Sequence, residues 1–83
     1  MTIKEAKKII REEDLDKWAI WFDERKKASA AGIERNGAGF NVYFTSPRWA
    51  VERGSIRYYE NMEEALDRFV HSARLAKKWF LDE

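Results

Sequence analysis

The sequence has no cysteine and a single histidine, His71. Without cysteine there can be no disulfide and no thiolate metal site, and one histidine cannot supply the ligands of a structural zinc site. Long apolar runs are also missing: the longest, residues 18–22, is far shorter than the roughly 20 residues that span a membrane. Charged residues stand near the start, where a secretory signal needs an apolar segment, so a cytoplasmic protein is expected.

An excess of one charge is missing as well. Sixteen Lys and Arg residues against fifteen Asp and Glu give a net charge of +1, and the two signs are interspersed without a basic block. This pattern disfavours nucleic acid as a partner. The 83 residues are expected to form one domain, 1–83, whose small core is strengthened by four tryptophans, three tyrosines and five phenylalanines.

Both ends of the chain are predicted to be helical. Thr2 and Glu5 have the spacing of a capping box, and the apolar stripe that follows does not include Leu15, so the first helix should end near residues 12–13. Asn61 is expected to cap the last helix. The predicted buried stripe of that helix consists of Met62, Ala65, Leu66, Phe69, Val70, Ala73, Ala76 and Phe80.

The middle of the chain is predicted to form an antiparallel sheet. The sequence RNGA, residues 35–38, suits a type I′ hairpin turn with Asn36 and Gly37 at its centre. That register places Ile33 opposite Phe40. Alternation then puts Phe40, Val42 and Phe44 on one side of the sheet and Asn41 and Tyr43 on the other. A further strand is predicted over residues 55–60.

Residues 17–27, KWAIWFDERKK, fit two structures. As a helix, the segment would continue to a glycine C-cap at Gly32. As a strand, it would turn Trp21 away from the core, and a four-residue loop would pair Phe22 with Ser29. The core side of that strand would carry Trp18, Ile20 and Phe22. An isolated hairpin is only marginally stable, which favours the additional strand, but the residues alone leave the helix open.

Several short motifs resemble a small family of bacterial immunity proteins from polymorphic-toxin systems. The similarity lies in IKEAKKII, EEDLDKW, FDERK, GIERNGAGFNVYF, ERG and NMEEALDRF, and it extends over most of residues 3–69. One departure is TSPRWAV, residues 45–51, because the family pattern reaches its glycine turn sooner. The resemblance implies an α+β fold with an N-terminal helix, an antiparallel meander of three to four strands and a C-terminal helix packed on one sheet face. It therefore favours the strand over 17–23.

No catalytic arrangement is visible in the sequence. His71 falls beside the polar face of the last helix, and the four serines have no base at a suitable spacing. The glycines of NGAG lack the lysine and the strand–loop–helix setting of a phosphate loop. An enzyme is therefore not expected, and neither is a cofactor or a metal site.

Aromatic and arginine side chains are the candidates for contacting a protein partner, because these residue types are enriched at interface hot spots. If the helices pack on one face of the sheet, the open face should present Trp21, Asn41, Tyr43, Arg57 and Tyr59. The alternative role of the tyrosines is ordinary cross-strand packing. Arg25, in the charged turn, is a further candidate.

Two other places carry candidate contacts. Arg48 and Trp49 belong to the loop SPRW, where the tryptophan either meets a partner or folds back as a lid on the core. Trp79 lies outside the buried stripe of the last helix together with Leu75. The alternatives for this pair are packing against the first helix or a homodimer contact.

The expected function is that of an immunity-type inhibitor, which binds a cognate bacterial toxin and occludes it without catalysing a reaction. The alternative is another small inhibitor, such as a phage-encoded anti-CRISPR protein, which shares the small size and the lack of catalytic motifs. A third class, stacking of single-stranded nucleic acid on aromatic sheet residues, is disfavoured by the near-neutral charge.

Overall fold

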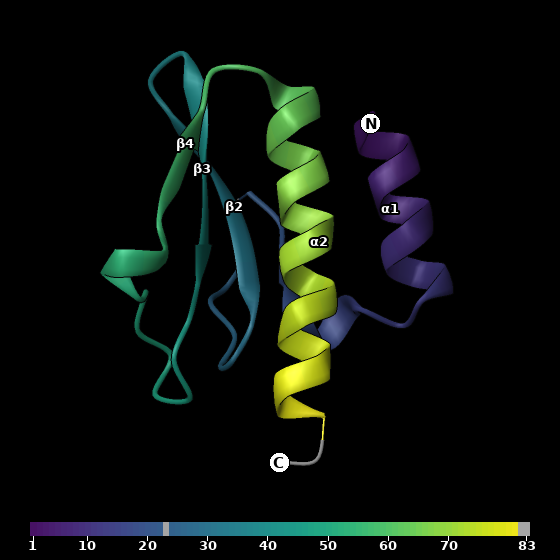
Figure 1. Cartoon of the computed structure of the whole chain (residues 1–83), viewed down its shortest axis with the longest axis vertical. Helices are drawn as coiled ribbons and strands as arrows, with labels where there is room; N and C mark the ends of the chain where they lie inside the picture. The colour runs from purple at the N-terminus through teal and green to yellow at the C-terminus, as the bar shows by residue number, and fades with distance from the viewer. Residues whose placement is uncertain (23, 82–83) are drawn as a thin grey trace.

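The computed structural model describes residues 1–22 and 24–81, which form two α-helices and a four-stranded sheet (Figure 1). In chain order the elements are α1 (Ile3–Glu12), β1 (Ala19–Ile20), β2 (Ala31–Asn36), β3 (Gly39–Phe44), β4 (Arg57–Tyr59) and α2 (Met62–Phe80). Short 3-10 turns occupy Asp16–Trp18 and Arg53–Ser55. The predicted α+β class is confirmed, with an N-terminal helix, a mostly antiparallel sheet and a C-terminal helix packed against the strands.

Helix α1 begins and ends where its sequence signals are. The Thr2 hydroxyl accepts from the Glu5 amide (3.1 Å), and the Glu5 carboxylate accepts from the Thr2 amide (3.0 Å), which confirms the capping box. At the other end, Asp14 is left-handed (φ 56°). The amides of Asp14 and Leu15 donate back to carbonyls of the last helical turn, at 3.2 and 2.7 Å. This Schellman-type end directs Leu15 into the core.

Helix α2 lies between the sheet and α1 (Figure 1). Asn61 caps it, accepting from the amides of Glu63 and Glu64. Its buried residues are Ala65, Leu66, Phe69, Val70, Ser72, Ala73 and Ala76. They match the predicted stripe except that Ser72 is added, while Met62 and Phe80 at the two ends are only partly buried. The helix thus supplies the centre of the main core and joins both outer layers to it.

Strand β1 pairs differently from the sequence prediction. It pairs with β2 in parallel, with Ala19 opposite Ala31. The predicted antiparallel pairing of Phe22 with Ser29 is therefore wrong, as is a continuous helix from Lys17; Asp23, the end of the predicted strand, lies outside the described residues.

The connection after β1 explains the parallel pairing. Lys27 donates from Nζ to the carbonyl of Asp16 (2.8 Å), in the 3-10 turn before β1, and to that of Ala19 (2.9 Å), the first residue of β1. The chain is therefore folded back across the beginning of the strand and enters β2 from the same end. The carbonyl of Lys27 in turn accepts from the buried Thr45 hydroxyl at 2.6 Å, which ties the connection to the end of β3.

The hairpin between β2 and β3 is present, but its register differs from the prediction by two residues. Asn36 pairs with Gly39, so the central turn residues are Gly37 and Ala38 rather than Asn36 and Gly37. Gly37 alone has positive φ among them (61°), as a II′-type turn requires at its first central position. Ile33 consequently faces Val42 and not Phe40. Because a shift of two residues keeps every side chain on its face, the predicted sides of β3 are correct.

Strand β4 is shorter than predicted, and its faces are reversed. Tyr59 pairs with Phe40 on the side of α2, and Tyr58 pairs with Asn41 on the other side. The prediction that Arg57 and Tyr59 lie on the open face is therefore wrong. The cause is the 3-10 turn before the strand, where the Ser55 hydroxyl accepts from the Phe44 amide (2.9 Å) and delays regular pairing until Arg57.

The sheet face opposite α2 is not open at its centre. Tyr43 lies across its strand partner Gly32 and is only 1% exposed. Its hydroxyl accepts from Lys26 Nζ at 2.7 Å. Together with Ile20 and Ala30 it forms a second, smaller core, against which side chains of the 45–56 segment pack. Tyr43 thus acts as a structural residue of this face.

Candidate functional site

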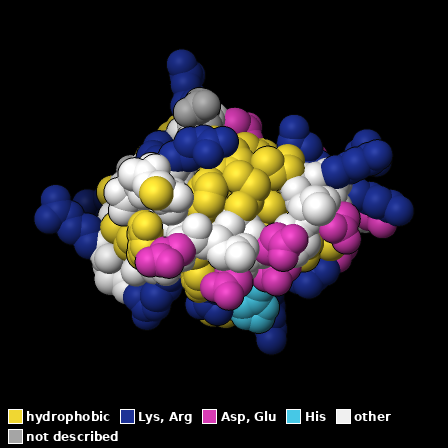
Figure 2. Space-filling view, turned by 90° about the horizontal axis from the view of Figure 1, so that it is seen from above, with side chains coloured by type: hydrophobic (Ala, Val, Ile, Leu, Met, Phe, Trp, Pro, Cys, Tyr) yellow, Lys and Arg dark blue, Asp and Glu magenta, His cyan; other side chains and the backbone are white. Residues whose placement is uncertain are grey.

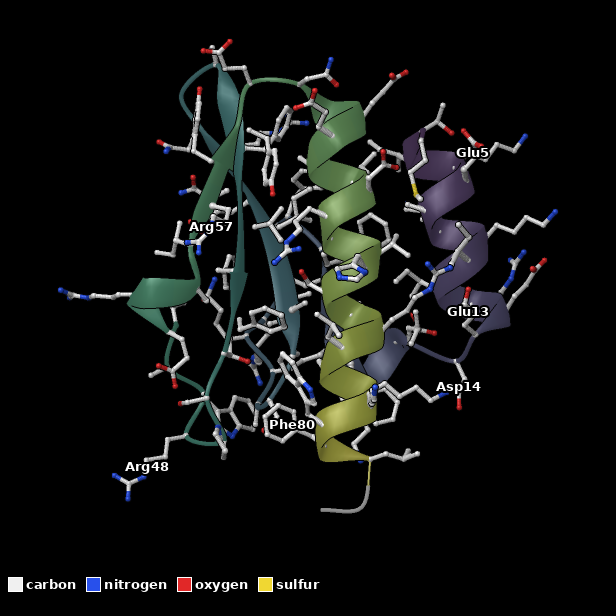
Figure 3. All side chains as sticks on the ribbon, viewed as in Figure 1. Glu5, Glu13, Asp14, Arg48, Arg57 and Phe80 are labelled. Atoms are coloured by element: carbon white, nitrogen blue, oxygen red, sulfur yellow. The ribbon has the colours of Figure 1, made fainter. Side chains whose placement is uncertain are left out.

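Three of the predicted contact residues, Arg48, Trp49 and Trp79, lie toward the end of the molecule that holds the C-terminal turn of α2. Figure 3 shows Arg48 and Phe80 at that end, on the 45–51 hairpin and on α2 respectively. We call Arg48, Trp49, Trp79 and Phe80 the Trp49–Trp79 surface. The segments that carry these residues are distant in sequence, but one groove is lined both by Ser46 and Pro47 of the hairpin and by Trp79 and Phe80 of α2.

The hairpin that carries Arg48 and Trp49 is held by a network centred on Ser46. The Ser46 carbonyl accepts from the Trp49 amide (3.0 Å), and the Ser46 amide donates to the Ala50 carbonyl (2.8 Å). Its hydroxyl accepts from the amides of Arg48 (3.2 Å) and Ala50 (3.3 Å). Below this turn, Thr45 forms a bridge with Val51. The tip is therefore a pre-formed turn.

Trp49 is both exposed and backbone-strained. Its side chain is 56% exposed, so the alternative in which it folds back as a lid on the core is wrong. Its φ is 71°, in the left-handed region that a residue with a Cβ enters at a cost of roughly 1–2 kcal/mol. Glycine would fit this position without strain. A bulky apolar side chain is thus exposed to solvent at a position whose backbone conformation favours glycine.

Trp79 forms one wall of a groove beside this hairpin. It is 57% exposed, and its ring centroid lies 5.7 Å from that of Phe44 at the end of β3. The groove measures about 260 Å³ and is lined by Phe44, Thr45, Ser46, Pro47, Glu52, Ser55, Trp79 and Phe80. Its lining is largely apolar, with Glu52 as its charged member, and it is large enough for one apolar side chain of a partner.

The structure does not place the other predicted contact residues on this surface. Trp21 turns toward α2, where its ring meets the edge of Phe69 at 4.8 Å, because the chain leaves the sheet directly after β1; its predicted place on the open face is wrong. Tyr43 is buried, and Tyr59 packs against the main core. Arg25 is exposed on the connection that precedes β2.

Arg57 has a different environment from the one predicted. Its guanidinium donates to the carbonyls of Gly54 (3.3 Å) and Ile56 (3.1 Å) at the outer edge of the sheet. It thus satisfies carbonyl groups of the segment that leads into the edge strand β4. Leu75, the predicted companion of Trp79, is partly buried.

Sequence reasoning missed Phe44 as a wall of the groove and Tyr58 as an exposed aromatic residue of the sheet. Tyr58 is 51% exposed and lies across Gly39. Alternation assigns Phe44 to the core, but it is the last residue of β3 and is only partly buried. Its position at a strand end, where the covering helix also ends, is the signal that could have identified it.

The carboxyl groups with displaced pKa lie at the ends of α1 and not at the groove. The Thr2 amide, by hydrogen bonding, lowers the pKa of Glu5. The guanidinium of Arg74, which donates to Glu13 at 2.6 and 2.8 Å, lowers the pKa of Glu13, and the same contact raises the pKa of Arg74. These shifts belong to helix capping and to the junction between α1 and α2.

Within residues 1–22 and 24–81, no group of three His, Cys, Asp or Glu side chains is arranged to hold a metal ion. In the same part of the chain, no helix is long and apolar enough to cross a membrane. The Trp49–Trp79 surface combines two exposed tryptophan rings, an arginine and a small apolar groove. No family model matches the chain, and no significant match to a curated protein or a solved structure was found.

Proposed function

We propose that the protein is an immunity-type inhibitor that binds a cognate bacterial toxin through the Trp49–Trp79 surface and occludes it. The observation that carries this proposal is Trp49, 56% exposed at φ 71° on a rigid hairpin tip. We attribute this backbone strain to a functional role: the free energy lost in the strained conformation would be recovered when a partner covers the exposed ring. The class of partner comes from the resemblance of the short sequence motifs to those of immunity proteins.

The energetics suit tight binding by a small surface. Tryptophan and arginine dominate interface hot spots, and each tryptophan ring that a partner covers removes a large apolar area from water. The Ser46 hydrogen bonds fix the hairpin before binding, so little loop entropy is lost on association. The groove between Trp79 and Pro47 would receive an apolar side chain of the toxin. Inhibition would then be steric, because the bound protein would occlude the active site of the toxin.

The test is a pull-down with the product of the neighbouring gene, followed by titration of the purified pair. Trp49→Ala should weaken binding by about 30-fold or more, the loss expected for a hot-spot residue worth about 2 kcal/mol. Tyr58→Ala is the matched control, because Tyr58 has a similar exposed fraction (51%) but lies on the sheet face. The circular dichroism spectrum should be unchanged in both variants.

Trp49→Gly separates binding from folding. Glycine relieves the left-handed strain, so the free energy of unfolding should stay the same or rise by about 1 kcal/mol. Toxin binding should nevertheless be lost. Equal affinity of wild type, Trp49→Ala and Trp49→Gly would remove this surface from the interface. Capture of a CRISPR effector instead of a toxin would reassign the protein to the anti-CRISPR class.

A further inference from the structure

A second surface lies at the opposite end of the molecule, beside the N-terminal half of α1. Its centre is a pocket of about 440 Å³ lined by Ile3, Lys7, Trp21, Phe22, Glu24 and Arg35. Figure 2 views the molecule from this end and shows an apolar patch bordered by both basic and acidic side chains. None of these residues belongs to the Trp49–Trp79 surface, so a binding role for this pocket is independent of the proposed function.

The floor of the pocket is aromatic and fixed in place. Trp21 meets Phe69 of α2 edge-on at 4.8 Å and lies 6.4 Å from Phe22. Phe22 in turn meets Phe40 of β3 at 6.1 Å. Both floor residues are only partly buried, so one part of each ring packs on the core while another part faces the pocket. Such a floor suits a flat apolar group, above all another aromatic ring.

Two cations stand over this floor. Lys7 Nζ lies 5.8 Å from the Trp21 ring, and the Arg35 guanidinium lies 5.1 Å from the Phe22 ring. Across residues 1–22 and 24–81, neither cation has a carboxylate within 4.0 Å. Glu24, the acid that lines the pocket, is already engaged: its carboxylate accepts from the Trp21 amide (3.0 Å) and lies 3.7 Å from Lys27. The pocket therefore favours an anionic ligand.

The positive charge continues from the pocket along α1. Lys4, Lys7, Lys8 and Arg11 recur at spacings of three and four residues and so form one stripe of the helix, lining a shallow hollow of about 380 Å³. Lys7 belongs to both the hollow and the pocket.

Acidic residues of α1 offset this stripe only in part, because four cations stand against Glu5, which lines the same hollow, and Glu12. Glu5 is held in the capping box, and Glu13 is bound by Arg74. Glu12 approaches Lys8 only to 3.9 Å, between two exposed side chains. The stripe is thus a predominantly basic surface of α1 that adjoins the aromatic pocket at Lys7.

We propose that this surface binds an acidic segment of a protein partner, with an aromatic side chain in the pocket and carboxylates along the α1 stripe. The charge pattern selects the ligand. Lys7 and Arg35, which have no carboxylate within 4.0 Å among residues 1–22 and 24–81, stand over an apolar floor, and the stripe spans about 10 Å at 1.5 Å per residue. That length matches three or four residues of extended peptide. A nucleic-acid strand is disfavoured because the whole chain carries only +1.

The experiment follows the four tryptophan indole N–H signals of the full chain by NMR, with the Trp21 signal assigned through Trp21→Phe. The probe is the blocked peptide DEFDE. Its controls are DEADE, which lacks the ring, and NQFNQ, which lacks the charges. We expect saturable movement of the Trp21 signal with DEFDE and at least about tenfold weaker binding of both controls, since ring and charges each contribute about 1.4 kcal/mol or more.

Substitutions test the assigned cations. Lys7→Gln and Arg35→Gln should each weaken DEFDE binding about twofold to fivefold, the range of an exposed charge contact. Lys78→Gln, an exposed cation at the other end of the molecule, should have no effect. Raising the salt concentration should weaken DEFDE in the wild type but leave NQFNQ unchanged.

Other outcomes would overturn the assignment. Equal affinity for DEFDE and DEADE would remove the aromatic anchor, and equal affinity for DEFDE and NQFNQ would remove the charge recognition. Tighter binding of a five-nucleotide oligothymidylate than of DEFDE would assign the surface to nucleic acid. No saturable movement of the Trp21 signal with any probe would show that the pocket does not bind. Trp49→Ala should bind DEFDE normally, so this result and the toxin result are separable.

Discussion

The second face of the sheet is tested most directly by Gly32→Ala. A Cβ at position 32 would overlap the ring of Tyr43, with ring carbon Cε2 only 2.6 Å away. The ring has no free path outward, because Tyr43 is 1% exposed and lies beneath Lys26, whose Nζ is 4.4 Å from the ring centroid. The backbone and the tyrosine would have to move together.

The size of the effect can be worked out from the contacts that are lost. Overpacking a well-packed interior costs about 1–3 kcal/mol, and moving Tyr43 also breaks the hydrogen bond from Lys26, worth about 0.5–1.5 kcal/mol. The free energy of unfolding should therefore fall by about 2–4 kcal/mol. At about 4–8 °C per kcal/mol for a domain of this length, the melting temperature should fall by about 10–30 °C.

Gly39→Ala provides the matched control. Its Cβ would likewise overlap a tyrosine ring, that of Tyr58, but this side chain is 51% exposed and can rotate into solvent. The expected loss is under about 1 kcal/mol. Both variants would be compared by thermal and urea unfolding. Equal losses, or a Gly32→Ala variant within about 0.5 kcal/mol of wild type, would refute the idea that Tyr43 is locked over Gly32.

Two further predictions concern the ends of α1. Asp14→Gly should raise the free energy of unfolding by about 1 kcal/mol in urea titrations, because Asp14 is left-handed (φ 56°); Asp14→Ala should give no gain, and a gain there would contradict the strain argument. The pKa of Glu13 is lowered from 4.5 by the Arg74 hydrogen bond, so this contact stabilises the fold above about pH 4.5 and is lost as the pH falls through the folded-state pKa. Glu13→Gln should therefore lose less stability than wild type on acidification below pH 4.5, whereas Glu12→Gln should follow the wild-type curve; parallel curves for wild type and Glu13→Gln would count against the contact.

Local signals predicted the helices well. Thr2 with Glu5 and Asn61 each supply side-chain acceptors for free helix amides, and these contacts depend only on neighbours within three residues. The buried stripe of α2 was likewise readable from its 3.6-residue period. The faces of β3 followed from strict alternation and survived the shifted turn.

Elements fixed by distant contacts were not predictable in the same way. The pairing of β1 depends on hydrogen bonds from Lys27 to the carbonyls of Asp16 and Ala19. The hydrophobic periodicity of the sequence gives no sign of these contacts. The reversed faces of β4 depend on a single serine hydrogen bond to Phe44. For the candidate sites, residue type identified Trp49 and Trp79, but only the fold could show that Trp21 belongs to a pocket with Arg35.

The contact between α1 and α2 also sets an order of assembly. Strands β2, β3 and β4 pair with their neighbours along the chain, so they require only short loops to close. In contrast, α1 is joined to α2 by the contact of Glu13 with Arg74, 61 residues apart, and long loops close at a higher entropic cost. The segment 31–80 should therefore fold first and the N-terminal segment dock onto it. During synthesis α1 leaves the ribosome before α2, so it cannot dock until α2 has been made.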